Sequence, residues 1–118
     1  MKKIYLVEDD HALRELISFL LMDKDYEVEA FANANSFKNK IPNAEADLIL
    51  LDIMLPDGNG VDICKLLKGT HNTKDIPVLL MSAHANPSIA NDSGANDFIA
   101  KPFNVDDLYM HVQKNIAS

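Results

Sequence analysis

Short apolar segments that end in polar residues restrict the fold of this 118-residue chain more than any other feature of its sequence. In the clearest one, residues 48–51 are four large aliphatic residues, and Asp52 and a stretch of turn residues follow directly. Such a run is typical of a strand that is buried on both faces, as in a parallel sheet. Similar segments at residues 4–7, 77–81 and 97–100 predict three more strands.

Helical periodicity occupies the stretches between the strands. After the first strand, apolar residues recur at three- and four-residue spacing, and Asp10 precedes them in the position of an N-cap. The buried face of this helix is expected to contain Leu13, Leu16, Ile17, Leu20 and Leu21. The last helix should begin after Asn104, and its inner face is expected to contain Val105, Leu108, Val112 and Ile116.

The remaining segments complete an alternating pattern. They predict a strand at residues 27–31, a short helix at 35–41 ended by Pro42, and a helix at 60–68 stopped by Gly69. Five strand–helix units with right-handed crossovers predict an α/β fold, a doubly wound (βα)5 sandwich with five parallel strands in the order 2-1-3-4-5. Residues 85–94 fit a helix poorly, because they include two Asn, one Pro and one Gly, so the fourth helix should be short or irregular.

The composition narrows the class of protein. Residues 1–118 suit a single domain, and the net charge of −7 with scattered basic residues argues against direct nucleic-acid binding. No apolar run approaches the ~18 residues of a membrane span, and no signal-peptide pattern follows Lys2 and Lys3. The only cysteine, Cys64, excludes an internal disulfide and fits a reducing, cytoplasmic compartment. Its place in the helix at 60–68 predicts an inert residue on a buried face.

Polar residues follow four of the predicted strands. Because the carboxyl ends of parallel strands meet at one edge of a sheet, that edge should carry Glu8, Asp9, Asp52, Ser82 and Lys101. Two carboxylates ~4 Å apart repel by roughly 4 kcal/mol at an effective dielectric constant of ~20, and a divalent cation relieves this repulsion. Ligands that are all oxygen favour Mg²⁺, with Mn²⁺ or Ca²⁺ as alternatives, over Zn²⁺.

This set of groups suits phosphoryl chemistry. A carboxylate beside Mg²⁺ can attack a phosphorus atom, and Asp52 is the candidate nucleophile. Positioned cations carry most of the catalysis of phosphoryl transfer, so Lys101 and Mg²⁺ would each hold a phosphoryl oxygen, with Ser82 and backbone N–H groups near Met54 as donors. Asp10 and Asp57 have simpler roles, as a helix cap and as a residue that shapes the turn at 56–58.

With these residues assembled, the chain resembles the CheY-like receiver domain of two-component response regulators, over essentially its whole length. The motifs that carry the resemblance are Val7-Glu8-Asp9-Asp10, Leu51-Asp52-Ile53-Met54-Leu55-Pro56 with Gly60 after it, Met81-Ser82-Ala83, and Lys101-Pro102-Phe103. Each motif is weak alone, but together in this order they are highly specific. The resemblance implies a flavodoxin-like fold that acts as a phosphorylation-dependent signalling switch and is no enzyme beyond its own phosphorylation and dephosphorylation.

The resemblance also implies a role for each site residue. Asp52 is the phosphoacceptor, Glu8 and Asp9 form an acidic pocket for Mg²⁺, and the backbone carbonyl of Met54 is a further metal ligand. Lys101 pairs with the phosphoryl group, and the Lys101–Pro102 bond is cis. Ser82 and Phe98 are the switch pair. Ala83 leaves room for the phosphodonor, and Met54 and His84 lie where the family tunes the lifetime of the acyl phosphate.

The implied partners are proteins. The donor would be a sensor histidine kinase or a phosphotransfer protein, with Arg14 and Ser18 of the first helix as candidate contacts. The chain would be either a stand-alone receiver with a protein target or the first part of a regulator whose effector domain is missing, and a monomer or a weak phosphorylation-dependent dimer. Lys101 follows Ser82 by only 19 residues, about one helical turn less than the family pattern. Signalling is therefore expected to use another face, or an order–disorder change in residues 85–94.

Three other functions compete with this interpretation. A phosphatase of the haloacid-dehalogenase type also uses an Asp nucleophile, but it needs a second Asp two residues later, where this chain has Met54. A flavodoxin-like cofactor binder needs a phosphate loop after the first strand, where this chain has Glu8 and Asp9. A degenerate receiver would keep the fold without phosphorylation, but all the required residues are present here.

Overall fold

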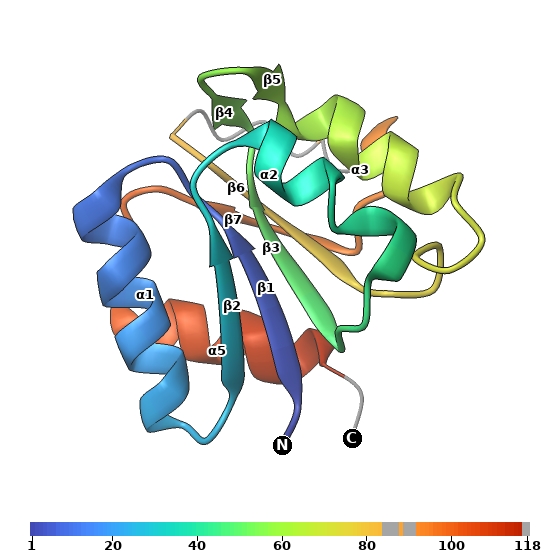
Figure 1. Cartoon of the computed structure of the whole chain (residues 1–118). Coiled ribbons are helices and arrows are strands. Elements are labelled where there is room, and N and C mark those ends of the chain that lie inside the picture. The colour runs from blue at the N-terminus through green and yellow to red at the C-terminus, as the bar shows by residue number, and fades with distance from the viewer. Residues whose placement is uncertain (84–87, 89–91, 117–118) are drawn as a thin grey trace.

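A five-stranded parallel sheet with helices on both faces forms the centre of the molecule (Figure 1). The computed structural model describes residues 1–83, 88 and 92–116. The strands lie in the spatial order β2 (Glu27–Phe31), β1 (Lys3–Val7), β3 (Leu48–Asp52), β6 (Val78–Ser82) and β7 (Asp97–Ala100). Numbered along the chain within this sheet, this is the predicted order 2-1-3-4-5, so the doubly wound fold is confirmed.

The helices form two layers that bury the two faces of the sheet. Helices α1 (His11–Asp23) and α5 (Val105–Asn115) cover one face, and helices α2 (Ala34–Lys38) and α3 (Gly60–Lys68) cover the other (Figure 1). Successive side chains of β1 point to opposite layers, because Ile4 packs in the α1/α5 core and Tyr5 in the α2/α3 core. Every residue of the central strands β3 and β6 is buried, as their continuous apolar runs predict.

Local signals set most of the helix ends. The side chain of Asp10 accepts the backbone N–H of Leu13 at 2.9 Å, so it is the predicted N-cap of α1. Gly69 is the C-cap of α3, also as predicted. Cys64 is fully buried in the α2/α3 core, which confirms its expected place on a buried helix face.

One predicted helix has different bounds in the structure. The helix expected at residues 35–41 is divided into α2 and a separate 3-10 turn, Ile41–Asn43, which contains Pro42 instead of ending before it. Proline is tolerated there because the first N–H groups of a helical turn have no partner within that turn.

Leu16 and Val105 are 52% and 42% exposed, although both were expected on buried faces. They face a groove between α1 and the start of α5 that no side chain of the described chain fills.

A short hairpin follows the third strand. It consists of β4 (Met54–Leu55) and β5 (Gly58–Asn59), which pair antiparallel directly after Asp52. The short fourth helix expected within residues 85–94, and the order–disorder change proposed there, fall mostly outside the described residues. Among the helices that the structure describes, none is long and apolar enough to cross a membrane.

Candidate functional site

The carboxyl edge of the sheet brings together side chains that lie far apart in the sequence. Lys101, just after β7, lies between two carboxylates: its Nζ is 2.6 Å from Oε1 of Glu8 and 3.1 Å from Oδ2 of Asp52. Glu8 and Asp52 are only 1% and 4% exposed. Ser82 is buried at the end of the adjacent strand β6, and its carbonyl accepts the backbone N–H of Lys101 at 2.7 Å. The predicted strand-end residues therefore share one site.

Asp9 adds a third carboxylate to this edge. Glu8, Asp9 and Asp52 each offer an oxygen atom, and these oxygens lie within 4.8 Å of one another. Asp9 is exposed, so the cluster is open to solvent on one side. Lys101 supplies one positive charge against three carboxylates, which leaves the site with excess negative charge when all are ionised. An open, all-oxygen site of this charge could hold a metal ion.

The cluster shifts the pKa values of its members. Burial raises the pKa of Glu8 from 4.5 to about 7, against the hydrogen bond from Lys101, which lowers it. The nearby carboxylate of Asp52 contributes further to the raised pKa of Glu8. Burial alone would lower the pKa of Lys101, but its contacts with Glu8 and Asp52 raise it overall. Lys101 therefore stays charged, and Glu8 is the group whose charge responds to a cation or a proton.

The backbone after Asp52 folds tightly around that carboxylate. The N–H of Met54 donates to Oδ1 of Asp52 at 3.2 Å, and the N–H of Gly60 donates to the carbonyl of Ile53 at 2.8 Å. A Cβ at position 60 would lie 2.3 Å from the carbonyl oxygen of Asp52, so only glycine allows this approach. The side chain of Met54 is exposed, whereas its backbone stays beside the site.

A second basic side chain, Arg14, supports the acidic pair. Its Nη1 donates to the carbonyl oxygens of Glu8 and Asp9 at 2.9 and 3.3 Å. Arg14 is half-buried and its guanidinium group binds the chain itself, and its expected role as a kinase contact stays a prediction. The sequence signal for its contact with the acidic pair is a basic residue in the first turns of the helix that follows an acidic pair.

The family model for the response regulator receiver domain matches residues 4–113. The chain belongs to this receiver family. It is 39% identical to the transcriptional regulatory protein KdpE of Staphylococcus aureus over 114 residues, which cover 94% of this chain and 48% of the relative. It is 34% identical to the phosphate regulon regulator PhoB of Klebsiella pneumoniae, over 95% of this chain and 50% of the relative. The chain thus spans about half the length of these curated relatives.

Solved structures agree with this assignment. The chemotaxis response regulator CheY4 of Vibrio cholerae matches with a TM-score of 0.92 and 28% identity, over 98% of this chain and 99% of that one. The BeF3-activated N-terminal receiver domain of RstA from Klebsiella pneumoniae matches with a TM-score of 0.87 and 28% identity, over 98% of this chain and 99% of that one. Family membership identifies a domain of phosphorylation-dependent signalling and disfavours the phosphatase alternative.

The expected switch residues of this receiver lie on its last two strands. Ser82 ends β6, and Phe98 on β7 is partly buried against the α2/α3 core. The Lys101–Pro102 bond is cis, as the resemblance implies. Ala83 is exposed beside Ser82, while His84, expected to tune the phosphoryl lifetime, lies outside the described residues.

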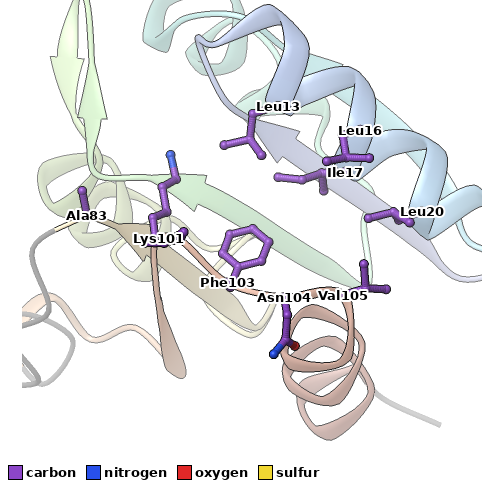
Figure 2. Close-up of a pocket in the computed structure, with 10 residues that line it drawn as sticks. Leu13, Leu16, Ile17, Leu20, Ala83, Lys101, Phe103, Asn104 and Val105 are labelled. Atoms are coloured by element: carbon purple, nitrogen blue, oxygen red, sulfur yellow. The ribbon is translucent and has the colours of Figure 1, made fainter.

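An apolar groove of about 340 Å³ begins beside Lys101 and runs between α1 and the start of α5. Figure 2 shows four side chains of α1 facing Phe103 and Val105, with Lys101 and Ala83 at one end. The side chains contributed by α1 are Leu13, Leu16, Ile17 and Leu20. The groove explains why Leu16 and Val105 are exposed, and it places an apolar surface next to the acidic site.

Proposed function

We propose that this receiver accepts a phosphoryl group on Asp52 from a phosphohistidine of a sensor histidine kinase or a phosphotransfer protein. The observation that carries the proposal is the position of Lys101, which bridges Glu8 and the Asp52 carboxylate inside a cluster of three acidic side chains. An Asp with a fixed cation and an acidic pair beside it is suited to act as a nucleophile toward phosphorus.

Atoms balance simply in the transfer step. An oxygen of Asp52 forms a bond to phosphorus while the phosphorus–nitrogen bond of the phosphohistidine breaks, and the released imidazole takes up a proton. The Nζ of Lys101 already lies 3.1 Å from Oδ2 of Asp52, so its ammonium group can also stabilise the negative charge on a phosphoryl oxygen. The N–H of Met54, beside Oδ1 of Asp52, and the hydroxyl of Ser82 are the further donors in this proposal.

Mg²⁺ is the cofactor that suits this donor set, with Mn²⁺ as an alternative. Glu8, Asp9 and Asp52 would hold it together with the backbone carbonyl of Met54, and all of these ligands are oxygen atoms. When bound, Mg²⁺ supplies positive charge for the phosphoryl oxygens. The excess negative charge of the cluster supports binding of a cation here.

The output of the switch would pass through Ser82 and Phe98. A phosphoryl group on Asp52 offers the hydroxyl of Ser82 a charged acceptor worth ~1.5–3 kcal/mol. A bias of ~2 kcal/mol shifts a two-state equilibrium roughly 30-fold. Phe98 has no hydroxyl group, so its coupling to Ser82 would depend on packing alone.

The partners follow from the surface near the site. In this proposal a helix of the kinase or phosphotransfer protein lies in the apolar groove, next to Lys101. Arg14 and Ser18 of α1, which line a separate hollow, are further candidate contacts. The output would be a protein target or an effector domain in a longer chain, because the curated relatives are about twice as long. We further propose a cytoplasmic single-domain unit, 1–118, that is monomeric or a weak phosphorylation-dependent dimer.

Intact mass after incubation with Mg²⁺ and acetyl phosphate tests the proposed function directly. The wild type should gain the mass of one phosphoryl group, and the gain should disappear in EDTA and in Asp52→Asn. A gain that persists in Asp52→Asn would place the phosphoryl group elsewhere and contradict the assignment. If the wild type gains nothing from acetyl phosphate or from a phosphorylated phosphotransfer protein, the degenerate receiver becomes the better interpretation.

A further inference from the structure

The hairpin that follows Asp52 is fastened at its tip to a different helix. Asp57 lies at the turn between β4 and β5, as its predicted role in the turn requires. Its carboxylate also reaches α2: Oδ1 accepts the N–H of Ala34 at 2.7 Å and Oδ2 accepts the N–H of Asn35 at 2.9 Å. These two hydrogen bonds hold the pKa of Asp57 below its usual range, so the carboxylate is ionised at neutral pH.

The contacts at the tip extend to the backbone beside Asp52. Met54 pairs with Asn59, and Leu55 pairs with Gly58, so the two short strands are held to each other. Gly58 also packs closely on α2, since a Cβ at that position would lie 3.0 Å from the Cβ of Ala34. At the base of the hairpin, the N–H of Met54 donates to Oδ1 of Asp52. Movement of the tip would therefore displace Met54 relative to Asp52.

The helix on the other side of this contact leads back to the acidic pair. Ala34 comes three residues after Phe31, the last residue of β2, and the carbonyl of Phe31 accepts the N–H of Glu8 at 3.0 Å. Asp57 thus connects the segment after β3 with the segment that supports Glu8. Beyond the pairing of their strands, the segments that supply the carboxylates of the site are therefore also connected through the Asp57 side chain.

Helix α2 has an N-cap residue of its own and does not need a second one from another part of the chain. Asn33, the N-cap residue, already accepts the N–H of Ser36 at 2.8 Å from within the helix itself. Asp57 accepts the N–H groups of Ala34 and Asn35, which come just before Ser36 and have no partner within the helix. The two side chains divide the first turn of α2 between them, but only Asp57 also belongs to the hairpin.

From this geometry we propose that Asp57 is a positioning residue of the phosphoacceptor site. It holds the hairpin against α2, and so keeps the backbone of Met54 in place beside Asp52 for the bound cation. The inference rests on the proposed function, because it assigns Asp57 a part in binding Mg²⁺. It predicts that loss of the Asp57 carboxylate weakens the binding of Mg²⁺ even though Asp57 does not touch the site.

Asp57→Ala and Asn33→Ala form a matched pair for the test. Each removes hydrogen bonds from the first turn of α2, but only Asp57→Ala releases the hairpin. Removing the groups that orient metal ligands typically weakens metal binding ~10- to 100-fold, and Asp57 acts one step further away, so we expect a loss of roughly 5-fold. Asn33→Ala should bind Mg²⁺ like the wild type, and Asp57→Asn, which keeps one good acceptor, should lie between.

Isothermal titration with Mg²⁺ gives the affinities, and hydrogen exchange of the metal-free proteins gives a readout independent of phosphorylation. The amide of Gly60, which donates to the carbonyl of Ile53 at the base of the hairpin, should exchange faster in Asp57→Ala than in the wild type. Its exchange rate should be unchanged in Asn33→Ala. Wild-type affinity in Asp57→Ala, or equal losses in both variants, would overturn the positioning role and leave the proposed function intact. A wild type that binds no Mg²⁺ would overturn the proposed function and this inference with it.

Discussion

The charge of Glu8 depends strongly on its surroundings. It is almost fully buried, and in the metal-free domain burial raises its pKa from 4.5 to about 7. A carboxyl group whose pKa is higher in the folded than in the unfolded state destabilises the fold once it ionises. The stability of the metal-free domain should therefore fall as the pH rises from about 4.5 to about 7, and the loss should level off above that range.

Glu8→Gln should remove this pH dependence, because the amide is neutral at every pH and its oxygen can still accept from Lys101. Relative to the wild type, the variant should gain up to about 3 kcal/mol of unfolding free energy between about pH 5 and about pH 8. Urea unfolding in EDTA at both pH values gives this difference, in which the other titrating groups cancel. An unchanged difference would mean that Glu8 ionises as freely in the fold as in the unfolded chain.

The sequence predicted contacts between two side chains better than contacts between a side chain and the backbone. Asp52 and Lys101 could be placed together because each follows an apolar strand, and parallel strands end at one edge. Arg14 and Asp57 could not be given their full roles, because their partners are backbone carbonyl and amide groups. Nearly every residue carries those groups, so which of them a side chain binds becomes visible only in the folded backbone.

Among the elements, α1 differs most from its predicted packing. The periodicity of α1 identified the apolar stripe, and Ile17 and Leu21 are indeed fully buried. The helical pattern could not show where the neighbouring helix α5 begins, however, and Leu16 lines a groove at that point. An apolar stripe wider than the core can cover is a common feature of a helix that also binds a partner.

Leu16→Glu tests the groove as the docking surface for the phosphodonor. The change should slow phosphoryl transfer from a phosphorylated phosphotransfer protein by about 10-fold, because a charge replaces an apolar contact at the interface. Labelling by acetyl phosphate, which needs no docking, should be unaffected, and intact mass against time measures both reactions. Met110→Glu is the control, since Met110 is similarly exposed on α5 but does not line the groove. Equal slowing in both variants, or in neither, would rule out the groove.

At the scale of the whole molecule, the site joins the first, third and last strands of the sheet. A ligand that binds only this assembled site stabilises the complete domain. Mg²⁺ at ~100 times its dissociation constant should therefore raise the unfolding free energy by about 2.7 kcal/mol. Asp9→Asn should largely lose this increment, because it removes the exposed carboxylate of the cluster.

Thermal or urea unfolding with and without Mg²⁺ measures the increment. Asp62→Asn is a suitable control, since Asp62 is an exposed carboxylate in the first turn of α3, outside the acidic cluster. The same Mg²⁺-dependent gain in wild type and Asp9→Asn would show that the ion binds elsewhere on this acidic chain.

The strand order could be predicted because short parallel connections have one hand and buried strands have a continuous apolar signature. Element ends were harder, because α2 and the 3-10 turn after it are too short to show a period, and Pro42 is compatible with either reading. The composition of residues 85–94 shows no clear helical face, so the sequence was least informative about the structure of this segment. The segment lies between Ser82 and Lys101, whose separation is about one helical turn shorter than the family pattern.

The wide separation of Lys101 from its two carboxylates has a consequence for synthesis of the chain. Lys101 is 93 residues from Glu8 and 49 from Asp52, so the acidic groups leave the ribosome long before their counter-charge. A nascent or truncated chain that ends before β7 carries the nucleophile without the ammonium group beside it. Phosphorylation would therefore be confined to molecules in which the chain extends past Lys101 and the receiver domain has folded.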